Sequence, residues 1–134
     1  MTYYERRWQQ RFQNFSRAFL LLEQSVELEN PSVIERAGLI QFFEMAFEQS
    51  WKVLKDFLEE EGFEMKSPRD AIKTAFQYQL IDDGQVWLEA LKDRNLTTHT
   101  YDETTAQDVE RNIKYRYYAV LKTLFDNFNE KLNQ

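Results

Sequence analysis

The sequence predicts an all-α protein, built as an up-and-down antiparallel bundle of three long and two short helices. Apolar residues recur at intervals of three and four over long stretches, as they do on one face of a helix. Aromatic residues make up 16% of the chain, whereas Gly numbers 3 and Pro 2, too few for the many turns of an all-β fold. With 134 residues the chain is long enough to close one core, so we expect a single helical-bundle domain over residues 1–134.

The first predicted helix covers about residues 3–28 and the second about residues 33–61. Asn30-Pro31 ends the first, because proline disfavours helical geometry in the residue before it, and Ser32 with Glu35 forms a capping box that opens the second. The first has one apolar seam: Trp8, Phe12, Phe15, Phe19, Leu22 and Val26. The second has a seam of Ile40, Phe43, Phe47, Trp51, Leu54 and Leu58, widened by Leu39, Phe42, Ala46, Val53 and Phe57. A helix with so much apolar surface is either central or shared with a partner.

Two short helices and a third long one complete the predicted bundle. Ser67 caps the first short helix, over residues 68–79, with Pro68 at its first position. The second short helix covers about residues 84–93 and is expected to bury Val86, Trp87, Ala90 and Leu91. The last helix is predicted to begin near Thr105, where a second capping-box pattern ends at Asp108. Its expected core residues are Ala106, Val109, Ile113, Tyr117, Val120, Leu124 and Phe128.

Composition excludes several classes of function. The chain has no Cys, so disulfides, thiolate catalysis and Cys-ligated zinc are absent, and with one His we find no metal cluster and expect no metal and no cofactor. The three glycines are isolated, which excludes a phosphate-binding P-loop. No apolar leader or stretch of roughly 20 apolar residues occurs, so we expect no membrane association and a cytoplasmic protein. A net charge of -6 opposes bulk nucleic-acid binding, and a local RNA site would work against that field.

The stretch between the last two predicted helices contains the most distinctive side chains. His99 is the only histidine, so any imidazole acid-base chemistry at neutral pH depends on it. Arg94 precedes it by five positions, and on an unbroken helix the two side chains would point roughly 140° apart. A break in the segment that starts at Asn95 would let a guanidinium bind a phosphate while the imidazole moves a proton. The alternative is that Arg94 supports the helix end and His99 is a loop residue.

Two further groups of polar residues have both a functional and a structural interpretation. The first group falls at helical spacing and consists of Glu44, Glu48, Lys52 and Lys55. It forms either a solvated helix face with a Glu48–Lys52 ion pair or a polar strip that lines a cleft. On the last helix, basic residues are interleaved with tyrosines, and both kinds of side chain can contact RNA. The net negative charge of the chain makes a solvated helix face the favoured interpretation. These residues are Arg111, Lys114, Tyr115, Arg116, Tyr117 and Tyr118.

The sequence resembles the HEPN superfamily of helical proteins, in the branch of nucleotidyltransferase substrate-binding proteins. The resemblance covers most of the chain. Each short motif is a weak sign of the family by itself, but the order and spacing of the motifs together are specific to it. The matching residues are Gly38-Leu39-Ile40-Gln41, Phe43-Glu44, Trp51-Lys52, Lys55, Ser67-Pro68-Arg69, Trp87, and Arg94-Asn95 through His99 to Tyr101. The resemblance implies a helical bundle that forms a homodimer and binds a minimal nucleotidyltransferase encoded nearby.

Two functions follow from this resemblance and remain open. In the first, the chain is a metal-independent ribonuclease toxin whose motif consists of Arg94 and His99, with Asn95 as the polar residue after the arginine. In this reaction a 2′-hydroxyl attacks the adjacent phosphate of RNA. The nucleotidyltransferase would then be the antitoxin and would transfer AMP to Tyr101, the last residue of an Arg-x4-His-x-Tyr motif. In the other, the chain is a non-catalytic subunit that only binds a substrate or the nucleotidyltransferase. The residues expected to support the site or line its cleft are Asn95, Glu44, Glu48 and Lys52.

Overall fold

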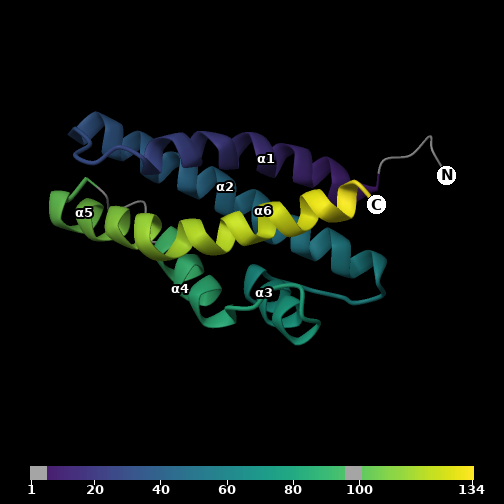
Figure 1. Ribbon diagram of the computed structural model, residues 1–134. Helices are drawn as coiled ribbons and strands as arrows, with labels where there is room; N and C mark the ends of the chain where they lie inside the picture. The colour runs from purple at the N-terminus through teal and green to yellow at the C-terminus, as the bar shows by residue number, and fades with distance from the viewer. Residues whose placement is uncertain (1–5, 96–100) are drawn as a thin grey trace.

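The computed structural model describes residues 6–95 and 101–134. These residues form α1 (Arg7–Val26), α2 (Val33–Glu60), α3 (Pro68–Gln77), α4 (Gly84–Arg94), α5 (Glu103–Asn112), the π-helical segment η2 (Ile113–Tyr117) and α6 (Tyr118–Leu132). The long helices α1 and α2 lie side by side, α6 packs against them, and the short pair α3 and α4 covers the opposite edge of α2 (Figure 1). The predicted all-α fold is confirmed, with α5, η2 and α6 together forming the third long helix.

Helix α2 is the centre of the bundle. It packs against α1, α3, α4, α5 and α6. This position explains its wide apolar surface, because neighbours on several sides cover Leu39, Phe43 and Phe47 completely and Phe42 and Phe57 in part. The central position of α2 in the bundle is therefore enough to explain its wide apolar surface. That surface no longer indicates a partner protein.

Most helix ends lie where the capping signals predict them. The side chain of Ser32 accepts from the N–H of Glu35 at 3.1 Å, and the carboxylate of Glu35 accepts from the N–H of Ser32 at 2.9 Å. The side chain of Ser67 accepts from the N–H of Asp70 at 3.1 Å. Helix α3 ends at Gln77, two residues earlier than predicted, since Gln79 adopts a left-handed backbone with φ of 64°.

The start of the last long helix differs from its prediction. Asp102 is the N-cap and accepts from the N–H of Thr105, so α5 begins at Glu103 and not at Thr105. The sequence contains two overlapping cap patterns here, and the upstream aspartate is the one used. Helix α1 also ends at Val26 and not at residue 28, while its predicted start at residue 3 lies outside the described residues.

The π-helical segment shifts the core register of this last helix. A π turn contains one more residue than an α turn, so positions after it are rotated relative to a regular helix. Tyr117 is buried as predicted, but Leu121 is fully buried in place of the predicted Val120, which is only half-buried. The next predicted core residues, Leu124 and Phe128, are buried. Among the described helices, none is long and apolar enough to cross a membrane.

Candidate functional site

Arg94 is the last residue of α4, and Asn95 is its C-cap. The helix therefore breaks directly after the arginine, at the segment where the sequence predicts a break. The next five residues, 96–100, lie outside the described residues, and with them the predicted His99. The described part of the motif consists of Arg94, Asn95 and Tyr101.

The carboxylate of Glu48 fixes the guanidinium of Arg94. Nη2 of Arg94 donates to Oε2 of Glu48 at 2.5 Å, and Nη1 donates to Oδ1 of Asn95 at 3.3 Å. The same oxygen of Glu48 accepts from the indole N–H of Trp51 at 3.2 Å, and Nζ of Lys52 lies 3.5 Å from Oε1. The predicted Glu48–Lys52 pair is thus present, but Glu48 also links α2 to the end of α4. A charged hydrogen bond of this kind orients a planar guanidinium.

Arg94 borders a cleft of about 390 Å³ between α1, α2 and the end of α4. Its charged lining residues are Arg17, Glu44, Glu48 and Arg94, and Leu21 and Met45 add exposed apolar surface. Two cations and two carboxylates balance each other here. Glu44 and Glu48 lie where the cleft-lining interpretation expects them, whereas Lys52 contacts Glu48 without lining the cleft. The charge balance means that the cleft by itself exerts little net attraction on a polyanion.

The last turn of α4 is anchored to the π-helical segment. Oδ2 of Asp93 accepts from the hydroxyl of Tyr117 at 2.5 Å and from Nδ2 of Asn112 at 3.1 Å. Arg116 of the same segment pairs with Glu89, one turn earlier on α4. Burial raises the pKa of the Tyr117 hydroxyl, and its hydrogen bond to Asp93 raises the pKa further. These contacts fix the residue directly before Arg94.

Sequence reasoning missed this anchor. Asp93 and Tyr117 are 24 positions apart, so no local pattern joins them. The one available signal is that Tyr117 lies on the predicted core seam, where a buried phenol needs a hydrogen-bond partner. An acidic residue on a facing helix is the natural acceptor, but the sequence alone does not select it.

Tyr101 lies at the exposed start of the last long helix. It precedes the N-cap Asp102, and 87% of its surface is exposed. The start of α5 is tied to α2, because Arg36 pairs with Glu103 and its Nε lies 2.6 Å from a carboxylate oxygen of Glu110. Tyr101 therefore lies exposed beside a helix start that is tied to the bundle.

The three basic residues of the last long helix are engaged in ion pairs within the chain. Arg111 pairs with Asp108, Lys114 with Glu110, and Arg116 with Glu89. This arrangement favours the interpretation of this face as a solvated, internally paired surface. In residues 6–95 and 101–134, no three acidic or histidine side chains come close enough together to hold a metal ion.

Comparison with known proteins places this geometry among helical relatives. The family model described as nucleotidyltransferase substrate binding protein like matches residues 10–134. The protein named Probable ribonuclease HepT, from Haemophilus influenzae, is 32% identical over an 87-residue alignment that covers 59% of this chain and 60% of that protein. The match therefore spans less than two thirds of that relative's length.

Two solved structures have the same fold. A Thermus thermophilus protein is 34% identical and superposes with a TM-score of 0.79, over 84% of this chain and 97% of that one. A Haemophilus influenzae protein, described as revealing the fold of a substrate binding domain of a nucleotidyltransferase, is 28% identical with a TM-score of 0.77. That alignment covers 92% of this chain and 99% of the Haemophilus chain.

Proposed function

Since the chain belongs to the family described as nucleotidyltransferase substrate binding protein like, we propose that it is the partner subunit of a nucleotidyltransferase and also a metal-independent ribonuclease. The observation that carries the second part is the position of Arg94. It ends α4, is oriented by Glu48 and borders a cleft, and it precedes His99 by the spacing of the Arg-x4-His motif. The similarity to the protein named Probable ribonuclease HepT supports the same activity.

The proposed chemistry needs one cation and one proton carrier. The guanidinium of Arg94 binds the phosphate bidentately and neutralises the charge that develops on its oxygens. The 2′-oxygen attacks phosphorus, the bond from phosphorus to the 5′-oxygen breaks, and the products are a cyclic phosphate and a 5′-hydroxyl. Imidazole of His99 carries a proton between the attacking and leaving oxygens. No metal takes part, so cleavage continues in the presence of a chelator.

The partnership gives Tyr101 a role in the same mechanism. We propose that the nucleotidyltransferase transfers AMP from ATP to the phenolic oxygen of Tyr101, with pyrophosphate leaving. The exposure of Tyr101 supports access by a second protein. An adenylate two residues from His99 adds bulk and negative charge beside the motif and so excludes an RNA phosphate. A homodimer in which two motifs share one surface belongs to the same proposal.

A non-catalytic subunit is the second candidate. The charge balance of the cleft favours it, because two cations and two carboxylates suit a small polar molecule better than a polyanion. In that case the chain holds a substrate for the nucleotidyltransferase, and Arg94 positions it.

Cleavage of a fluorescent RNA in EDTA separates the two candidates. Wild-type protein is expected to cut, while Arg94→Ala and His99→Ala each lose at least about a hundredfold in rate, as is typical for removing a catalytic group. Arg111→Ala, which removes an exposed arginine on α5, is the matched control and keeps the wild-type rate. Absence of cutting by wild type, or equal cutting by His99→Ala, would favour the substrate-binding subunit.

A further inference from the structure

A groove runs between α3 and α4 and shares no lining residue with the Arg94 cleft. It consists of two hollows of about 530 and 510 Å³, which share Gln85 and Leu88 as lining residues. One end is lined by Phe76 and Gly84, and the other by Lys92 and Asn95. Because Asn95 accepts a hydrogen bond from Arg94, the groove leads directly to the described part of the motif.

The cations of this groove differ from most others in the chain. Basic side chains elsewhere in the described residues mostly pair with carboxylates, as Arg36, Arg94 and Arg116 do. By contrast, every Lys and Arg from residue 66 to residue 92 is exposed, and none of them is within ion-pair distance of a described acidic side chain. Three of these line the groove, namely Arg69, Lys73 and Lys92.

The lining of the groove itself contains little opposing charge. Among the residues that line the two hollows, Glu89 is the one acidic side chain, and Arg116 already binds it. The groove thus presents three cations that form no ion pair with any described residue, in a protein of net charge -6. The Arg94 cleft, in contrast, balances its own charges, so the groove is the stronger local attractor for a string of phosphates.

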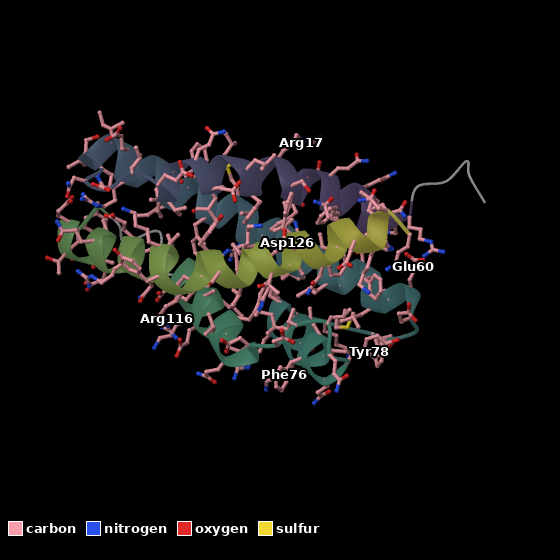
Figure 2. All side chains as sticks on the ribbon, viewed as in Figure 1. Arg17, Glu60, Phe76, Tyr78, Arg116 and Asp126 are labelled. Atoms are coloured by element: carbon pink, nitrogen blue, oxygen red, sulfur yellow. The ribbon has the colours of Figure 1, made fainter. Side chains whose placement is uncertain are left out.

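Phe76 adds an aromatic surface at the far end of the groove. Half of its surface is exposed (50%), and Figure 2 shows it at the outer side of α3, away from the bundle. Its ring is supported from α4, because a Cβ at Gly84 would lie 3.1 Å from two of its ring atoms. An exposed ring held in place beside cations is the combination that binds single-stranded nucleic acid, in which phosphates meet the cations and a base stacks on the ring.

We propose that the groove between α3 and α4 binds single-stranded RNA and delivers the strand to Arg94. This inference rests on the proposed ribonuclease function and names the surface that holds its substrate. Arg69, Lys73 and Lys92 contact successive phosphates, and Phe76 stacks on a base. The groove holds the RNA, and the residues at the end of α4 cut it.

Binding of a short fluorescent single-stranded RNA tests the groove apart from the chemistry. All variants carry His99→Ala so that the probe is not cut, and anisotropy is measured over a range of salt concentrations. Replacing Arg69, Lys73 and Lys92 by Ala is expected to weaken binding at least about tenfold at low salt. The slope of log K against log salt should fall by about 2, since each lost single-strand phosphate contact removes about 0.7. Phe76→Ala should weaken binding by about tenfold.

A control of equal charge makes the result specific. Replacing Arg6, Arg111 and Lys122 by Ala removes three cations from exposed ion pairs on α5, α6 and the residue before α1. This control should retain most of the affinity. If it weakens RNA binding as much as the groove variant does, the attraction is a property of total charge and the groove proposal is wrong.

The remaining outcomes separate this inference from the proposed function. If the groove variant without His99→Ala binds and cuts RNA like wild type, the groove proposal fails and the ribonuclease stands. Conversely, groove-dependent RNA binding by a wild-type protein that never cuts would support the groove and refute the ribonuclease. A groove variant that keeps RNA affinity but loses binding to the nucleotidyltransferase would show that the groove is a protein interface, which also overturns the proposal.

Discussion

The hydrogen bond from Tyr117 to Asp93 offers a quantitative test of how the motif is held. Replacing Tyr117 by Phe removes the hydroxyl and keeps the ring. The ring continues to stack on Phe43, at 5.6 Å between centroids, and stays beneath the guanidinium of Arg116, 5.8 Å away. Asp93 retains the hydrogen bond from Asn112. The substitution therefore isolates one partly buried, charge-assisted hydrogen bond.

Its expected contribution follows from its length and burial. The oxygens lie 2.5 Å apart, Tyr117 is 1% exposed, and the acceptor is a carboxylate. A hydrogen bond to a charged group contributes about 1.5–3 kcal/mol to the free energy of unfolding. Because Asp93 keeps a second donor, we expect a loss of about 2 kcal/mol. For a chain of this size, this corresponds to a decrease in Tm of roughly 6–10 °C.

Urea unfolding at neutral pH measures this loss, and Tyr115→Phe is the matched control. Tyr115 belongs to the same π-helical segment but is 78% exposed, so its hydroxyl contributes little. Equal stability of the two variants would mean that the hydrogen bond from Tyr117 to Asp93 does not stabilise the fold. The pKa of Tyr117 is raised from its ordinary value of 10, so its contribution is complete below pH 10 and is lost as the pH rises above it. Wild type and Tyr117→Phe should therefore converge in stability at alkaline pH.

Two other predictions concern the pairing of α2 with α5 and the oligomeric state. Burial raises the pKa of Glu110, but hydrogen bonds from Lys114 and Arg36 outweigh it and lower that pKa below its ordinary 4.5. The stabilisation from Glu110 is therefore present above pH 4.5 and lost as the pH falls below that value. Glu110→Gln should be less stable than wild type at neutral pH and approach wild-type stability in acid. A difference in the free energy of unfolding that stays constant with pH would contradict this. The protein alone should sediment as a dimer at micromolar concentration, and a monomer would remove the shared two-motif surface from the proposal.

The fold was largely predictable because its signals are local. Ser32 and Ser67 cap their helices as expected. The apolar seams of α1 and α2 are buried except at Val26 and Trp51, which are partly buried. The family model confirms the resemblance to nucleotidyltransferase substrate-binding proteins. Errors arose where two local signals competed, as at Asp102 and Thr105. The π-helical segment, which exchanges Val120 for Leu121 in the core, has no pattern that distinguishes it from a regular helix.

The candidate site was predictable in part. The order of Arg94, His99 and Tyr101 along the chain can be read directly, and so can the need for a break after Arg94. Its support could not be predicted, because Glu48 and Arg94 are 46 positions apart and meet only in the folded chain. The groove between α3 and α4 was missed for the same reason, since its cations come from two separate helices.

We propose that one site makes this protein both a ribonuclease and the substrate of its nucleotidyltransferase. The most direct measurement is the rate of RNA cleavage by wild type and by Tyr101→Phe, before and after incubation with the nucleotidyltransferase, ATP and a divalent ion. Both proteins are expected to cut RNA before treatment. After treatment, wild type should gain an adenylate by intact mass and stop cutting. Tyr101→Phe should gain no adduct and continue to cut. An adenylated wild type that cuts RNA at its original rate, or a Tyr101→Phe protein that is modified and silenced like wild type, would contradict it.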